Sequence, residues 1–93
     1  MKNDFLNFFG KVSGRVQGVG YRTWTKKTAE YYGLYGWVKN CHDGSVELEV
    51  FGAKEKVNKF LKKCYKGPIL SKVEKIDILK KKYKEYHNFE IVY

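Results

Sequence analysis

The stretch from Val12 to Arg22, which reads VSGRVQGVGYR, restricts the possible folds of this chain more than any other part. It has the pattern of a strand that runs into a turn and then into a helix beginning near Tyr21. Gly18 and Gly20 let the backbone take positive φ and let a ligand approach the main chain closely. Successive N–H groups can then converge at a helix N-terminus, which suits a phosphate. The stretch therefore predicts an anion cradle.

Arg22 supplies a full positive charge at this predicted cradle. Its planar guanidinium can hold two phosphate oxygens at once, which a lysine cannot do. The same residues also suit an ordinary strand-to-helix turn, because neither the Rossmann spacing nor a Walker A lysine is present. A second group of residues is needed to choose between the two interpretations.

That second group lies in the stretch 36–52, which reads GWVKNCHDGSVELEVFG. Alternating apolar and polar residues predict two strands joined by a turn, with Asp43-Gly44 as turn chemistry. Val46 begins the apolar face of the second strand, and Glu47 and Glu49 lie on a polar face. Asn40 comes just before the turn, where its amide can point off the end of the first strand.

Together the two stretches resemble the acylphosphatase family. The first matches the family pattern at Val12, Gly14, Val16, Gln17, Gly18, Val19, Tyr21 and Arg22. The second matches it at Gly36, Trp37, Val38, Lys39, Asn40, Gly44, Val46 and Gly52. Gly20 stands at a variable position of the pattern. The resemblance covers nearly the whole chain, since Gly67-Pro68 and Val73 also fall where the family has them.

The resemblance implies a hydrolase that cleaves acyl phosphates to a carboxylate and inorganic phosphate, without a metal or other cofactor. It assigns phosphate binding to Arg22 and the positioning of the attacking water to Asn40. The loop whose N–H groups hold the phosphate oxygens is implied to comprise Gln17, Gly18, Val19, Gly20 and Tyr21. Inorganic phosphate is implied to bind the same cradle as product and as a competitive inhibitor.

Composition agrees with one small ordered domain over residues 1–93. The chain has 43% hydrophobic and 17% aromatic residues, and it has no apolar run long enough for a signal peptide or a membrane span. Two cysteines in this length do not make a disulfide framework. We therefore expect a cytoplasmic protein that is monomeric and acts on a small molecule, with no membrane or nucleic acid as partner.

Periodicity predicts an α+β chain of the ferredoxin-like order βαββαβ, with a short additional strand at the end. The expected elements are strands at 5–13, 35–41, 45–51, 71–78 and 88–93, and helices at 21–32 and 54–65. The second helix has the clearest apolar stripe, beginning at Val57 and ending at Cys64. We expect an antiparallel sheet with the first and third strands central, the last strand at an edge, and both helices on one face.

The formal charge of +9 leaves other functions open. One alternative is an RNA-binding module of the same fold, because the chain is basic and rich in aromatic residues. The predicted third strand, with Glu47 and Glu49, argues against it, since these carboxylates would repel phosphates. Another alternative is a domain that binds phosphate without turnover, against which Asn40 argues. The lysine runs, one at 54–63 and one at 80–84, are read as solvated surface.

Overall fold

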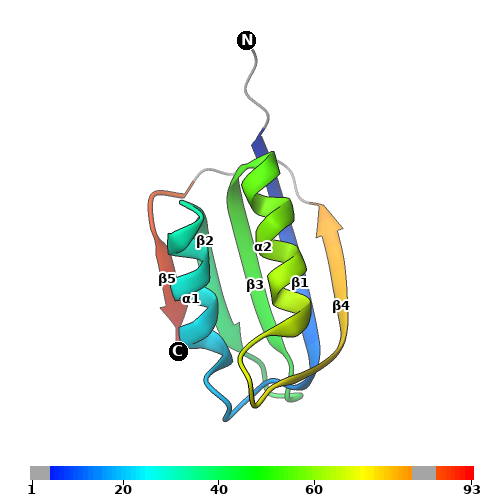
Figure 1. Cartoon of the computed structure of the whole chain (residues 1–93). Helices are drawn as coiled ribbons and strands as arrows, with labels where there is room; N and C mark the ends of the chain where they lie inside the picture. The colour runs from blue at the N-terminus through cyan, green and yellow to red at the C-terminus, as the bar shows by residue number, and fades with distance from the viewer. Residues whose placement is uncertain (1–4, 81–85) are drawn as a thin grey trace.

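The computed structural model describes residues 5–80 and 86–93 of the chain. A five-stranded sheet is covered on one face by two helices, as Figure 1 shows. The elements in chain order are β1 (Phe5–Arg15), α1 (Tyr21–Tyr31), β2 (Tyr35–Asn40), β3 (Val46–Ala53), α2 (Lys54–Lys66), β4 (Lys72–Lys80) and β5 (Phe89–Val92). The predicted ferredoxin-like α+β order, with a short extra strand, is confirmed.

The strand order is β4-β1-β3-β2-β5, so that β1 and β3 are central and β5 lies at an edge, as predicted. The register is continuous across the sheet: one row of paired residues contains Lys80, Phe8, Val50, Gly36 and Phe89. The end of β4 and the start of β5 therefore lie at the same end of the sheet, although they belong to opposite edges (Figure 1).

The prediction of an antiparallel sheet was wrong at this last strand, because β5 pairs with β2 in parallel and the sheet is mixed. The physical reason is that the end of β4 and the start of β5 lie in the same row of paired residues. A strand that begins where β4 ends can only run back along the sheet in the direction opposite to β4. β2 already runs in that direction, since β1 is antiparallel to β4 and β3 is antiparallel to both β1 and β2.

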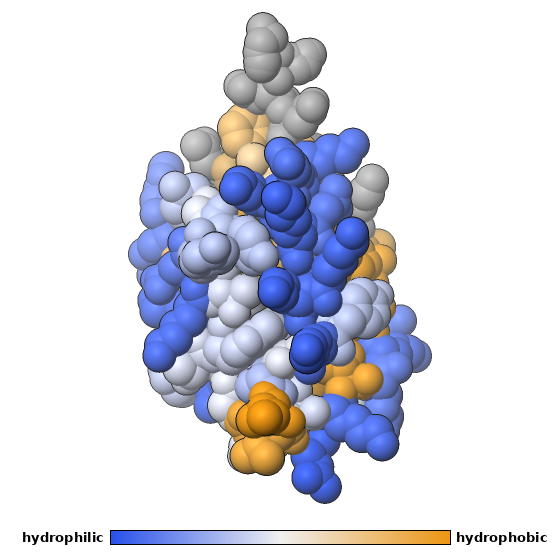
Figure 2. All heavy atoms as spheres, viewed as in Figure 1, coloured by the Kyte–Doolittle hydropathy of each residue, from blue (hydrophilic) through white to orange (hydrophobic). Residues whose placement is uncertain are grey.

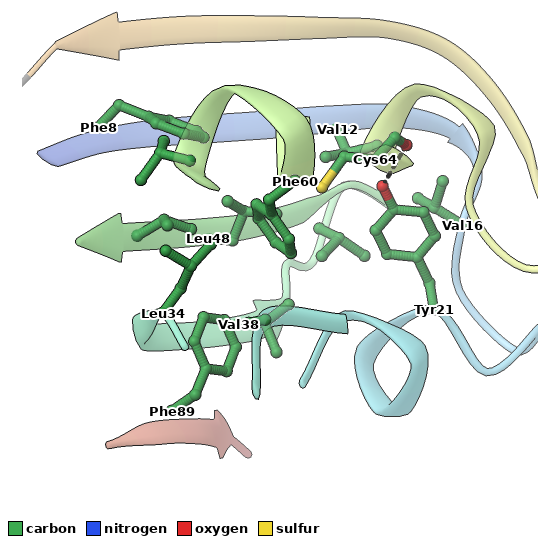
Figure 3. Packing of buried hydrophobic residues seen from close by; sticks show 14 residues of the cluster. Phe8, Val12, Val16, Tyr21, Leu34, Val38, Leu48, Phe60, Cys64 and Phe89 are labelled. Atoms are coloured by element: carbon green, nitrogen blue, oxygen red, sulfur yellow. Dashed lines mark hydrogen bonds between the residues drawn. The ribbon is translucent and has the colours of Figure 1, made fainter. Parts of the chain in front are cut away.

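The core lies between the sheet and the helices, and Figure 3 shows its side chains. α2 presents Val57, Phe60 and Cys64 to it, as the predicted stripe requires. α1 is less apolar and buries a tyrosine, a threonine and an alanine, which are Tyr21, Thr25 and Ala29. Both helices therefore lie on one face of the sheet, and the loop that leads into α1 lies at one end of it.

The opposite face of the sheet is less polar than predicted. Glu49, expected on a polar face, is only 4% exposed, and Phe51 beside it is also buried. The rings of Phe5 and Phe51 stack with their centroids 5.5 Å apart, and Phe9 lies 6.2 Å from Trp37. Aromatic side chains from three strands therefore cover much of this face, which local alternation along one strand does not reveal.

The ends of several elements differ from their predicted positions by one or two residues. β1 continues two residues further, to Arg15, because it pairs with β4 beyond a register shift at Ser13/Gly14. Most of the lysine run at 80–84 lies outside the described residues. Within the part of the chain that the structure describes, neither helix is long and apolar enough to cross a membrane.

Candidate active site

The predicted cradle lies between the end of β1 and the first turn of α1. Gly18 and Gly20 have φ of 75° and 80°, the left-handed conformation that their spacing predicted. Gly20 is the N-cap of α1, no side chain caps this helix end, and its first turn contains no acidic residue. The N-terminus of α1 therefore offers its N–H groups and the positive end of its dipole to an anion.

A small hollow of about 100 Å³ lies at this helix end. It is lined by Val16, Gly18, Gly20, Tyr21, Arg22, Thr23 and Asn40. The structure thus brings the two predicted groups of residues together, although 18 positions separate Arg22 from Asn40 in the sequence. A water molecule takes roughly 30 Å³ in the liquid, so the hollow has room for only a few atoms of that size. This is enough for a phosphoryl group and little more. Any larger part of a ligand would extend outside it.

Asn40 is the last residue of β2 and lines the hollow. Its Oδ1 atom is buried, and none of the described residues donates a hydrogen bond to it. A buried carbonyl oxygen without a donor costs free energy until a water or ligand satisfies it. Asn40 is therefore ready to accept a hydrogen bond from a molecule in the hollow.

Arg22 stands in the first turn of α1 and is half-buried. Its guanidinium lies over the ring of Tyr93, with Cζ 5.0 Å from the ring centroid. None of the ion pairs among the described residues involves Arg22. The arginine is thus held against an aromatic ring while its charge stays available for an anion.

The side chain of Gln17 makes its contacts outside the hollow. Its Nε2 donates hydrogen bonds to the carbonyl oxygens of Cys41 and Ser45, each 2.8 Å away, and it does not line the hollow. Val19 does not line the hollow either and packs against the core. The Gln17 side chain therefore ties the cradle loop to the β2–β3 turn, next to Asn40.

Tyr21 lines the hollow but points its side chain into the core (Figure 3). Its hydroxyl donates a hydrogen bond of 2.7 Å to the carbonyl of Cys64. Burial raises the pKa of Tyr21 and also the pKa of the Cys64 thiol, both well above their usual ranges. Both groups stay protonated, so Cys64 is a core residue and not a nucleophile.

The turn that follows Asn40 is closed by Asp43. Its carboxylate accepts hydrogen bonds from the Ser45 hydroxyl at 2.6 Å and the Ser45 N–H at 3.0 Å, and it pairs with Lys11 at 2.9 Å. These hydrogen bonds, first that from the Ser45 hydroxyl and then that from Lys11, hold the pKa of Asp43 well below its usual range. Asp43 thus has the turn role that the sequence predicted.

Three residues of the site were missed in the sequence. Val16 and Thr23 line the hollow, and the Tyr93 ring contacts Arg22. Thr23 could have been identified from the sequence, because it follows Arg22 in the first turn of the predicted helix. Tyr93 could not have been identified in this way, since it reaches α1 only through the parallel pairing of β5 with β2.

Among residues 5–80 and 86–93, no group of three His, Cys, Asp or Glu could hold a metal ion.

These features define a class: a small α+β sandwich with a phosphate-sized hollow at a helix N-terminus that no side chain caps. The sequence profile of the acylphosphatase family matches residues 8–91. An acylphosphatase of Rhodopseudomonas palustris is 49% identical over 65 residues, which are 70% of this chain and 66% of that protein. An acylphosphatase of Clostridium acetobutylicum is 45% identical over 86 residues, which are 89% of this chain and 92% of that protein.

Solved structures agree. The crystal structure of acylphosphatase from Bacillus subtilis matches with a TM-score of 0.91 at 38% identity, covering 95% of this chain and 99% of that chain. An acylphosphatase from Coxiella burnetii matches with a TM-score of 0.92 at 30% identity, over 96% of this chain and 94% of that chain. The chain therefore belongs to the acylphosphatase family and is an enzyme of that family.

Proposed function

We propose that this enzyme hydrolyses acyl phosphates, with Arg22 binding the phosphate and Asn40 orienting the attacking water. The observation that carries the proposal is the hollow itself. It is lined by Arg22, which has no carboxylate partner among the described residues, and by Asn40, whose amide oxygen is buried and has no donor among them. The guanidinium suits a phosphate, and the amide oxygen suits a water. Both residues line one hollow of about the size of a phosphate.

In this proposal the phosphoryl group lies in the cradle, with its oxygens on the N–H groups around Gly18 and Gly20 and on Arg22. The acyl part extends out of the hollow, which is too small to hold it. Because an acyl phosphate has a good leaving group, the enzyme mainly needs to place the water in line and neutralise charge on the phosphoryl oxygens. Both tasks are electrostatic and positional.

The water oxygen attacks phosphorus, and the bond between phosphorus and the acyl oxygen breaks. The bonding electrons leave with the carboxylate, and a proton of the water passes to a phosphoryl oxygen, which gives inorganic phosphate. Asn40 Oδ1 accepts a hydrogen bond from the water and so orients it. The proposal needs no general base from the protein and no metal, since the substrate's own oxygen takes the proton.

The RNA-binding alternative has less support than this reaction, although aromatic rings lie on the open face of the sheet. RNA-recognition domains stack bases on aromatic side chains of their central strands. Here β3, a central strand, carries Glu47 and Glu49 on the face away from the helices. Binding of phosphate without turnover accounts for Arg22 and the cradle but not for the Asn40 oxygen.

The direct test is to mix the purified protein with benzoyl phosphate in the presence of a chelator and follow the loss of the mixed anhydride. Hydrolysis should far exceed the spontaneous rate, and inorganic phosphate should inhibit it competitively. The Arg22→Ala variant serves as a matched control for trace contaminating enzymes. A rate equal to that of buffer alone contradicts the proposed activity. Activity that is lost with chelator and restored by added metal contradicts the metal-free mechanism.

A further inference from the structure

The helix face of the molecule carries a groove that the proposed reaction does not use. Its volume is about 400 Å³, and it is lined by Trp24, Lys27, Thr28, Tyr31, Tyr32 and Lys63. None of these residues lines the hollow that contains Arg22 and Asn40. A ligand in this groove would therefore not compete for the cradle.

α1 and its C-cap residue Tyr32 supply all of this lining except Lys63, which α2 contributes. The α1 residues from Trp24 to Tyr31 recur at helical spacing and form a stripe distinct from the one buried against the sheet. Figure 2 shows this face of the molecule, where a pale strip runs between flanks of hydrophilic side chains. The groove thus lies between the two helices and is open to solvent.

Three aromatic side chains line the groove, and each contacts another ring. Tyr31 is 82% exposed, and its ring meets that of Tyr32 edge to face with centroids 5.0 Å apart. Trp24 packs on Tyr21 with centroids 5.4 Å apart. Exposed aromatic rings provide stacking surfaces for a planar ligand.

The groove is also cationic. Neither Lys27 nor Lys63 takes part in any ion pair of the described residues, whereas Lys26 and Lys59 pair with glutamates of their own helices. No carboxylate lines the groove. The Thr28 hydroxyl donates to the Trp24 carbonyl at 2.8 Å, which leaves its oxygen free to accept a hydrogen bond. An anion here meets two uncompensated charges.

We propose that this groove binds a mononucleotide, with its base on the rings of Trp24 and Tyr31 and its phosphate between Lys27 and Lys63. The Thr28 oxygen would accept a hydrogen bond from the sugar. The volume falls in the range of small-molecule sites, roughly 300–1,000 Å³. A mononucleotide suits the groove better than a long strand, because the rings form one site and not a row of sites.

The test uses adenosine 5′-monophosphate as probe and amide and indole NMR signals of the labelled protein as readout. Titration should shift the Trp24 indole signal and the amides of Lys27 and Tyr31 with one saturable Kd. Inorganic phosphate should instead shift the amides of the cradle. The double variant Lys27→Gln/Lys63→Gln should weaken binding of the nucleotide about tenfold or more, the effect expected of losing two phosphate contacts. Tyr31→Ala, at an exposed ring, should also weaken it.

The matched control is Lys62→Gln/Lys66→Gln, which removes the same charge from α2 outside the groove. It should leave the Kd within about twofold, because its lysines are screened and do not contact the ligand. Arg22→Ala should also keep nucleotide binding, which separates this proposal from the proposed function. Shifts confined to the cradle, or equal losses in the two double variants, overturn the proposal. A single-stranded oligonucleotide that binds far more tightly per nucleotide overturns the choice of a mononucleotide.

Discussion

Arg22 and Asn40 act on different parts of the reaction in the proposed mechanism, so their loss should have different signatures. Arg22 contacts the phosphate before and during reaction, and Arg22→Ala should weaken both phosphate inhibition and turnover. Asn40 contacts the water, so Asn40→Ala should lower turnover by roughly 10²-fold while phosphate inhibition changes little. Steady-state kinetics with benzoyl phosphate and phosphate as inhibitor measure both effects.

Thermal melting is the control for this pair, because both side chains line a hollow and neither belongs to the core. Asn40→Ala even removes a buried oxygen that has no donor among the described residues, so its stability should not fall much. Full turnover in Asn40→Ala, or phosphate inhibition weakened as much as in Arg22→Ala, would show that the assigned roles are wrong.

Asp43 gives the turn after Asn40 a dependence on pH. Its folded-state pKa is lowered, so its charge stabilises the fold above the unfolded pKa of about 3.9 and ceases to do so as the pH falls through the folded value. Asp43→Asn should therefore melt at a lower temperature than the wild type at pH 7. Melting curves from pH 7 down to pH 2 should show this difference shrinking below about pH 4. A difference that stays constant over that range would contradict the pairing of Asp43 with Ser45 and Lys11.

At the scale of elements, the site depends on how the cradle loop is joined to the β2–β3 turn. The cradle loop connects β1 to α1, whereas Asn40 is the last residue of β2. β2 lies next to β3 in the sheet and not next to β1. The two hydrogen bonds from Gln17 to the Cys41 and Ser45 carbonyls connect them directly. We therefore expect Gln17 to act as a positioning residue that keeps Asn40 at a constant distance from the proposed phosphate site.

Gln17→Ala removes both hydrogen bonds and should reduce the free energy of unfolding by roughly 1–3 kcal/mol. It should also lower kcat by about tenfold or more, because small displacements of positioned groups are costly for rate. Chemical denaturation and steady-state kinetics measure the two effects. Gln17→Glu keeps the side-chain length but faces two carbonyls with a carboxylate, so it should be at least as damaging. If Gln17→Ala loses stability with unchanged kcat, the link serves only the fold.

At the scale of the whole molecule, we expect phosphate to change stability in two ways, through the charge of +9 and through the proposed cradle. Any salt reduces self-repulsion between the lysines, and this effect does not depend on the anion's fit. Phosphate bound in the cradle adds a specific contribution that grows with the logarithm of its concentration. The two are separable by comparing salts of equal ionic strength.

Phosphate at 100 times its Kd should raise the melting temperature by on the order of 10 °C above chloride of equal ionic strength. Sulfate should have a similar effect, because it presents the same tetrahedral oxygens to the cradle. Calorimetry of the wild type and Arg22→Ala measures it, and the variant should lose most of the difference. Equal melting temperatures in phosphate and chloride would mean that the cradle does not bind the anion.

Much of this fold could be predicted because its causes are local. The positive φ of Gly18 and Gly20, the stripe of α2 and the Asp43 turn depend on residues within a few positions of one another. Such short-range preferences are present in the sequence as spacings. Arg22 and Asn40, which line one hollow, were linked in the sequence only by the roles that the family resemblance gives them in one reaction, and not by any local pattern.

Tertiary structure alone decided the features that join distant segments. The direction of β5 follows from where β4 ends in the sheet, and the contact of Tyr93 with Arg22 depends on that direction. The burial of Glu49 depends on rings from neighbouring strands, and the role of Gln17 depends on carbonyls 24 and 28 positions away. The sequence by itself determined which elements form and which residues could bind a phosphate. Strand order and direction determined which side chains meet, because these contacts exist only once the sheet has assembled.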